Sequence, residues 1–188
     1  MNIAVTIQGV TPLLMNRFTE DNELAVSSSV RKVNIGQKPS PREQAEKKTY
    51  TNSSGELCVP GPNIFASIIQ AGTFHKVGKS KITTTKSSLI PAGMAIPEVD
   101  CSLGTKDFEV DSRSVVIPST GGRIMAHRPR LDEWQLSFTL EVDENMFDEQ
   151  TARVLVDDAG SKVGLGDFRP ARKGPFGRFK VVNWKKKK

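Results

Sequence analysis

The residue types best suited to chemistry gather in one stretch, residues 164–177, which reads Gly-Leu-Gly-Asp-Phe-Arg-Pro-Ala-Arg-Lys-Gly-Pro-Phe-Gly. Its glycines let the backbone approach a ligand closely, and exposed backbone amides can hold a phosphate. The arginines add forked donors for phosphate oxygens, and the phenylalanines can stack on unpaired bases. The candidate binding residues in and directly after this stretch are Gly164, Gly166, Phe168, Arg169, Arg172, Lys173, Phe176 and Arg178.

This stretch lacks the Gly-Lys-Ser/Thr ending of a Walker loop, and it precedes an expected strand rather than a helix. Both features exclude a nucleotide-binding P-loop and a dinucleotide fingerprint. The alternative to a ligand-binding loop is a long bulged turn whose phenylalanines only pack.

Three other segments could extend the site. Solvated surface charge is the alternative for the basic ones, and core packing is the alternative for Met15. A stacking role for Trp134 is less favoured than a place in the core. The candidates are Arg123, His127, Arg128 and Arg130 in one segment, Lys76, Lys79 and Lys81 in the second, and Met15, Asn16 and Arg17 in the third.

Charge is distributed unevenly along the 188 residues. The formal net charge is +6, yet residues 161–188 alone hold ten Lys/Arg and one acid, so the first 160 residues sum to −3. The basic residues end in a predicted tail, residues 185–188. Such asymmetry favours a polyanionic partner, because binding phosphates releases condensed counterions.

Cysteine and histidine are scarce. Cys58 and Cys101 do not form a CxxC pair and only two histidines are present, so the sequence predicts no metal site and no cofactor. Two lone cysteines fit a reducing compartment. No apolar run is long enough to span a membrane and the N-terminus has no signal-peptide pattern, so we expect a soluble, cytoplasmic protein.

The elements that must position these residues follow from periodicity. Alternating or β-rich runs predict strands, helical spacing of apolar residues predicts helices, and the order gives an α+β, ferredoxin-like (RRM-like) βαββαβ core with long insertions in a single domain. The core strands are expected at 2–8, 114–118, 136–142 and 178–184, and its helices at 62–74 and 148–160. A short helix capped by Ser40 is expected near 41–49, inside a polar excursion at 17–55.

Three motifs together resemble the RAMP superfamily of CRISPR-associated proteins. They are Gly-Leu-Gly with Gly-Pro-Phe-Gly in the basic loop 161–177, the opening segment Gly9–Met15, and the helix entry Val59–Ile69. The resemblance implies a guide-RNA-binding protein, most like the backbone subunit that polymerises along the guide, with residues 17–55 as its protruding thumb. The chain is shorter than typical backbone subunits, which leaves open a free-standing or virus-encoded relative.

Three functions remain open. The first is non-catalytic binding of single-stranded RNA by a homo-oligomer, together with other effector-complex subunits. The second is a sequence-tolerant single-stranded DNA-binding protein of a phage or mobile element, which only a 2′-hydroxyl preference would separate from the first. The third is a metal-independent endoribonuclease using His75 or His127. Asp21 matches the region of the cleaving aspartate in target-cutting backbone subunits, but its acidic surroundings fit a solvated loop equally well.

Overall fold

The computed structural model describes residues 1–18, 39–116 and 121–187. Its strands are β1 (Asn2–Gly9), β2 (Leu13–Leu14), β3 (Cys58–Pro60), β4 (Lys76–Val77), β5 (Ser80–Lys81), β6 (Met94–Ala95), β7 (Asp100–Ser102), β8 (Glu109–Val116), β9 (Arg123–Leu131), β10 (Gln135–Val142) and β11 (Phe179–Lys187). Its helices are α2 (Pro41–Glu46), α3 (Gly61–Ala71), α4 (Ile90–Gly93) and α5 (Glu149–Asp158), with the 3-10 turns η1 (Gly72–Phe74) and η3 (Pro170–Arg172) and the π-helical turn η2 (Ala159–Val163).

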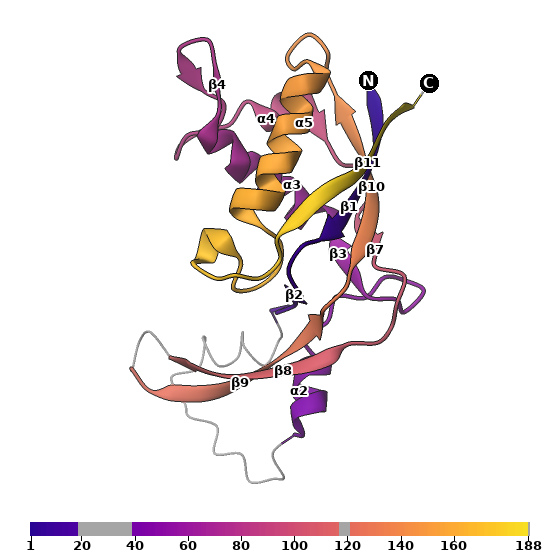
Figure 1. Cartoon of the computed structure of the whole chain (residues 1–188), viewed down its shortest axis with the longest axis vertical. Helices are drawn as coiled ribbons and strands as arrows, with labels where there is room; N and C mark the ends of the chain where they lie inside the picture. Colours follow the sequence, from indigo (N-terminus) through magenta and orange to yellow (C-terminus); the bar gives the residue numbers. More distant parts are fainter. Residues whose placement is uncertain (19–38, 117–120, 188) are drawn as a thin grey trace.

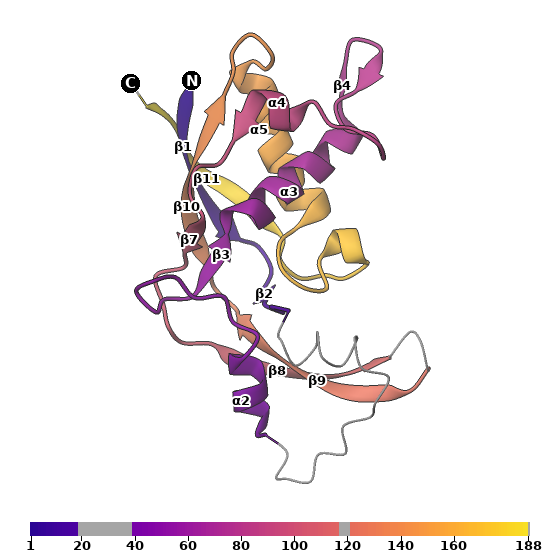
Figure 2. The ribbon, with the colours of Figure 1, turned by 180° about the vertical axis from the view of Figure 1, so that it is seen from behind.

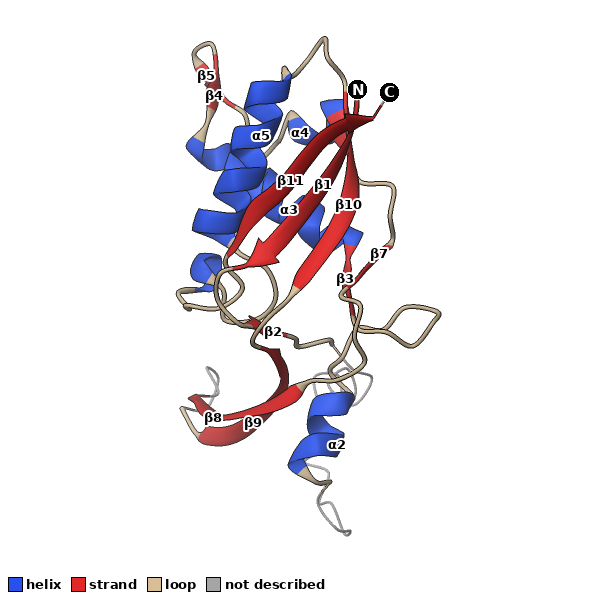
Figure 3. Ribbon diagram, turned by 45° about the vertical axis from the view of Figure 1, so that its right-hand side comes forward, coloured by secondary structure: helices blue, strands red, loops and turns tan. Residues whose placement is uncertain are grey.

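The central sheet has four antiparallel strands in the order β11-β1-β10-β6. Strand β1 lies in the middle, where Asn2 opposes Glu141 of β10 on one side and Lys187 of β11 on the other. Helices α3 and α5 cover one face of this sheet, and the other face is open (Figure 3). In chain order β1, α3, β6, β10, α5 and β11 form a βαββαβ unit, which confirms the predicted α+β class and ferredoxin-like core.

The second core strand was predicted wrongly. The expected strand at 114–118 overlaps β8, which pairs with β9 instead, and residues 117–118 lie outside the described part of the chain. The core strand is β6, only two residues long and paired with the end of β10. The Val-Val run is typical of a buried strand, but Val116 is 53% exposed near the end of a hairpin. Strand β6 has only two residues, which are too few for a periodicity to show in the sequence.

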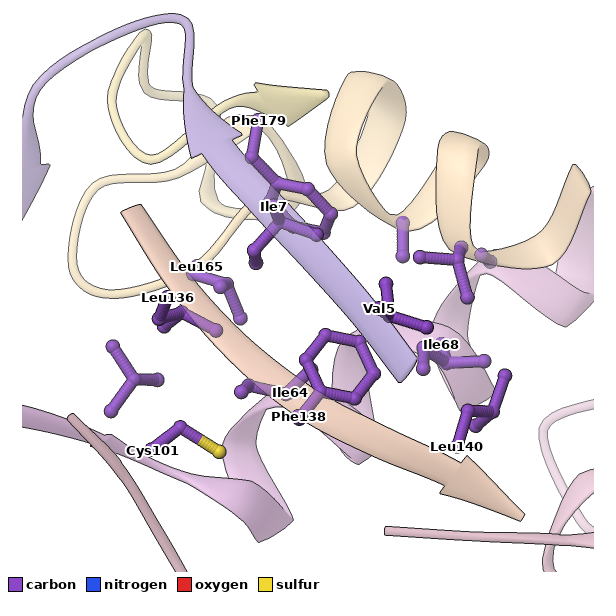
Figure 4. Close-up of a cluster of buried hydrophobic side chains, with 14 of the residues drawn as sticks. Val5, Ile7, Ile64, Ile68, Cys101, Leu136, Phe138, Leu140, Leu165 and Phe179 are labelled. Atoms are coloured by element: carbon purple, nitrogen blue, oxygen red, sulfur yellow. The ribbon is translucent and has the colours of Figure 1, made fainter. Parts of the chain in front are cut away.

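The core lies between the sheet and the two helices (Figure 4). Ile3, Val5 and Ile7 alternate inward from β1, and Ile64 and Ile68 meet them from α3 at helical spacing. Figure 4 also labels Phe138, Leu140, Phe179 and, from the glycine-rich loop, Leu165. That loop is therefore attached to the core through one of its own side chains.

A second sheet, in the order β2-β9-β8, projects from the end of the central one (Figure 1). Helix α2 packs against the β8–β9 hairpin, and the Arg42 guanidinium lies 3.7 Å from the centre of the Phe108 ring. The predicted cap of α2 is confirmed, because Ser40 Oγ accepts from Glu43 N while the Glu43 carboxylate accepts from Ser40 N.

The excursion at 17–55 is only partly within the described residues, since 19–38 fall outside them, as does Asp21. Its remaining part contains α2 at the base of the β8–β9 hairpin. Within residues 1–18, 39–116 and 121–187, no helix has the length and apolar character that crossing a membrane requires.

Candidate nucleic-acid interface

The glycine-rich loop has a conformation that its glycines make possible. Gly166 and Gly177 have φ of +71° and +70°. A Cβ on Gly166 would lie 2.3 Å from the carbonyl oxygen of Leu14, and a Cβ on Gly177 would lie 1.8 Å from that of Leu165. Leu165 N donates to Gly177 O over 2.9 Å, so the two ends of the loop are joined. The loop is thus held in one shape by close backbone packing.

A cleft of about 250 Å³ lies between this loop, the segment after β2 and one face of α3. It contains four of the predicted positions, Asn16, Gly164, Gly166 and Arg169, together with Met15, whose side chain is buried in the core. Its polar lining also includes residues that the sequence did not single out, namely Tyr50, Asn63, Ser67 and Gln70. Asn63, Ser67 and Gln70 follow the i, i+4, i+7 spacing of one helix face, which is the signal that could have found them.

Asp167 connects the loop to the β8–β9 hairpin. Its Oδ2 lies 2.6 Å from Arg128 Nε and 3.3 Å from Asn16 Nδ2. The Arg128 Nε–H is not aligned on that oxygen, so the contact is an ion pair and this buried donor makes no hydrogen bond within the described chain. Lys48 Nζ donates to His127 O over 2.9 Å. Burial and the neighbouring Arg128 lower the pKa of Lys48, and Asp167 partly offsets them.

The arginines of the loop differ in their surroundings. Arg169 is partly buried, and its Nη1 donates to Gly166 O over 2.9 Å. Burial is the main cause that lowers the pKa of the Arg169 guanidinium, and Arg172 adds to it while Asp167 opposes it. Arg172 and Lys173 are exposed at η3. Arg178 donates its backbone N–H to Thr11 Oγ1 and Nη1 to Ser161 O, so it braces the loop from outside the cleft.

The two phenylalanines of the loop do not have equal access to a ligand. Phe176 is 6% exposed, and its ring centre lies 4.9 Å from the Arg113 guanidinium. Phe168 is 42% exposed, and the two ring centres are 6.2 Å apart. The packing alternative therefore describes Phe176, whereas Phe168 has a ring surface available for stacking.

The segment with Arg123, His127, Arg128 and Arg130 forms strand β9. Arg123 is exposed at its start, and Arg130 Nε contacts Asp132 Oδ1 at 2.5 Å on a side away from the cleft. His127 is buried, with Nδ1 2.7 Å from Ser112 Oγ, directly opposite in the register. Within the described chain, Arg128 is the one of these four that forms an ion pair with the loop. Trp134 is a core residue, with Nε1 donating to Thr11 O.

Lys76, Lys79 and Lys81 are exposed on the β4–β5 hairpin, at the opposite end of the molecule from β8–β9 (Figures 1 and 2). The structure therefore does not bring these lysines into the cleft. Arg17, exposed beside Asn16, donates its backbone N–H to Lys48 O.

The predicted basic tail belongs to β11, which continues through Lys187, while Lys188 lies outside the described residues. Lys187 Nζ donates to Thr139 Oγ1 on the open face of the sheet, where Thr6 and Ser137 also share a hydrogen bond. RRM proteins stack bases on aromatic rings of this face. The outward residues of β1 and β10 are Asn, Ala, Thr, Gln, Ser and Glu, so neither strand offers such a ring there.

The described residues contain no group of three or more His, Cys, Asp or Glu placed to hold a metal ion. Cys58 and Cys101 are buried free thiols on the neighbouring strands β3 and β7. Burial, with help from nearby carboxylates, raises their pKa to about 11 and about 12.

No protein-family model matches this sequence, and no curated protein matches it. Among solved structures, the chain is similar to a chain in the cryo-EM structure of the Type III-B Cmr-beta bound to cognate target RNA. The TM-score is 0.56 at 12% sequence identity, and the match covers 98% of this chain and 59% of that one. What the two share is the fold. This chain therefore spans about three fifths of the length of its structural neighbour.

Proposed function

We propose that this protein is a non-catalytic, single-stranded RNA-binding subunit that oligomerises along a guide RNA in a CRISPR-type ribonucleoprotein. The three motifs that resemble the RAMP superfamily support this proposal. So does the fold shared with a chain of the RNA-bound Cmr-beta structure, over almost the whole of this chain.

The observation that carries the proposal is the cleft between the glycine-rich loop, the segment after β2 and α3. The partly buried guanidinium of Arg169 faces this cleft, and Lys48 and Arg128 lie behind Asp167. Besides the hydrogen bond to Gly166 O, the Arg169 guanidinium has further N–H groups that can donate hydrogen bonds to a phosphate. A desolvated guanidinium gains more from an anion than an exposed one does, because water screens it less.

The polar lining favours RNA over DNA. The side chains of Asn63 and Gln70 make no hydrogen bond within the described chain, and Tyr50 adds a phenolic hydroxyl. A ribose 2′-hydroxyl both donates and accepts hydrogen bonds, so amide side chains at the cleft can bind it, and deoxyribose offers them no such group.

The test is a titration of the purified protein with labelled single-stranded RNA, single-stranded DNA and double-stranded RNA of equal length, combined with mass measurements on long RNA. We expect tightest binding to single-stranded RNA and growth of the complex in equal protein increments. Tighter binding to single-stranded DNA would support the phage-type alternative. A single 1:1 complex at saturation on long RNA would contradict the backbone role.

One observation favours an endoribonuclease as a second candidate. His75 Nε2 lies 2.7 Å from Asp158 Oδ2, and a carboxylate that orients a histidine is a common feature of general acid–base sites. Incubation with end-labelled RNA in EDTA separates the two proposals. Cleavage that His75→Ala abolishes while RNA binding persists would establish the nuclease, whereas the non-catalytic proposal expects intact RNA.

A further inference from the structure

A phenylalanine outside the glycine-rich loop has a largely exposed side chain. Phe74 ends η1, directly after α3, and its side chain is 54% exposed. Lys162 Nζ, from η2, lies 5.1 Å from the centre of the Phe74 ring. A cation on one face of an aromatic ring leaves the other face free for a flat partner.

The surroundings of Phe74 are basic. Lys76, Lys79 and Lys81 follow it on the β4–β5 hairpin, which has no acidic residue. Within the described chain, none of these three lysines forms an ion pair. The nearby acid, Asp158, is already engaged by His75 and by Lys162 Nζ at 2.5 Å. An exposed ring among lysines matches a polyanion with flat bases better than an apolar protein surface.

This surface is continuous with the cleft. Gln70, which lines the cleft, lies one helical turn before Phe74, and Lys162 lies two residues before Gly164. The glycine-rich loop, α3 and the β4–β5 hairpin follow one another along the same side of the molecule (Figures 1 and 2). A strand leaving the cleft along α3 and η2 therefore reaches Phe74 and then the hairpin lysines.

We propose that Phe74 is a stacking platform for one unpaired base of the bound strand, with Lys162 and the hairpin lysines contacting the flanking phosphates. This inference rests on the proposed function, and it adds a site beyond the cleft. It also gives a role to Lys76, Lys79 and Lys81, which the fold places away from the predicted binding residues of the cleft. We call Phe74, Lys162 and these three lysines the distal site.

The test compares wild type, Phe74→Ala and Phe74→Trp, with Val182→Ala as control. Val182 is also an exposed apolar residue, at 45%, but lies on β11. Stacking on one base contributes enough that we expect Phe74→Ala to weaken RNA binding by about 5- to 100-fold. The salt dependence of binding should stay unchanged, because no charge is removed. Val182→Ala should bind like wild type.

Phe74→Trp gives an independent measurement. We expect its affinity to match wild type and its added fluorescence, after subtraction of the wild-type signal, to be quenched by RNA through base stacking. Equal affinities of Phe74→Ala and wild type, together with an unquenched Phe74→Trp, would overturn the platform. If that result came with strong wild-type binding that Arg169→Ala weakens, the proposed function would stand and the platform alone would fail. Absence of wild-type binding would overturn both.

Discussion

The glycine-rich loop and the β4–β5 hairpin are both basic, and both turn through glycines with positive φ, yet they are built differently. In the loop, backbone oxygens lie where a Cβ of Gly166 or Gly177 would be, and Leu165 reaches the core. In the hairpin, nothing lies within 4 Å of a Cβ on Gly78, and every residue of the hairpin is exposed. The loop is held by packing, whereas the hairpin is held by its own short pairing.

Because of this difference, basic residues of the loop can orient a bound anion, whereas those of the hairpin can only attract it. Arg169, partly buried and bonded to Gly166 O, presents its guanidinium in a fixed direction. The hairpin lysines are exposed point charges on flexible stems, so they attract a polyanion without orienting it. Substitutions in the loop, in the hairpin and at their junction should therefore differ in how strongly they change stability or RNA affinity, and in which of the two they change.

The largest effect is expected from a methyl group in the loop. Gly177→Ala combines positive-φ strain with a clash against Leu165 O, and we expect it to lower the free energy of unfolding by roughly 3 kcal/mol or more. Gly78→Ala, its matched control, meets only the backbone strain and should cost about 1 kcal/mol. Urea unfolding of both variants measures this, and equal losses would contradict the contrast.

The second effect concerns Arg169. Removing a charge-assisted hydrogen bond to phosphate costs about 1.5–3 kcal/mol, so we expect Arg169→Ala to weaken RNA binding by about 10- to 100-fold. Arg169→Lys should recover little of this loss, because an ammonium cannot bond Gly166 O and a phosphate with the same planar fork. Fluorescence anisotropy titrations provide the measurement. Wild-type affinity of Arg169→Lys would mean that the loop, too, supplies only charge.

The third effect is expected to be electrostatic alone. Replacing Lys76, Lys79 and Lys81 together with alanine should reduce the slope of log affinity against log salt by up to about 2, at roughly 0.7 for each phosphate that is no longer neutralised. Affinity should fall clearly at low salt and little at high salt. A loss of the same size at both salt concentrations would indicate directional hydrogen bonds and would remove the contrast with Arg169.

The smallest effect is expected at the junction of the two regions, where Asp158 contacts His75 near the hairpin and Lys162 near the loop. Burial alone would raise the pKa of Asp158, but hydrogen bonds from Lys162 and His75 outweigh it and lower this pKa below its ordinary value of 3.8. A carboxyl with a lowered pKa adds stability that is present above the unfolded-state pKa and is lost as pH falls through the folded-state pKa. Asp158→Asn should therefore flatten the acid end of the stability curve, measured by thermal unfolding between pH 5 and about pH 2. An unchanged dependence of the melting temperature on pH would show that the contacts of Asp158 with His75 and Lys162 add nothing to stability.

Sequence patterns predicted the elements whose signals are local. Strand β1 alternates, α3 repeats its apolar residues at helical spacing, and Ser40 caps α2 by accepting from the backbone amide three residues on. These signals depend on neighbours within one or two turns, so a single sequence contains them. In the structure, residues 164–177 lie between η2 and β11 and include the 3-10 turn η3.

The rest depended on contacts between distant residues. Strand β6 has two residues and exists only because it pairs with the end of β10. The ion pair of Arg128 with Asp167 joins positions 39 residues apart, and no periodicity connects them. The burial of Phe176 against Arg113 has the same origin. Asn63 and Gln70 were visible as polar positions on α3, but only the folded loop gives their face a cleft to line.

Leu165 belongs to two sets of residues at once. It is buried in the core beneath the sheet, and it lines the cleft beside Arg169. Any ligand that tightens the loop must therefore raise the melting temperature of the whole domain, by linkage. The converse matters for genetics. If the proposed function holds, a selection for weakened RNA binding should return core substitutions next to Leu165 alongside substitutions in the cleft, and a parallel selection on protein abundance will tell the two classes apart.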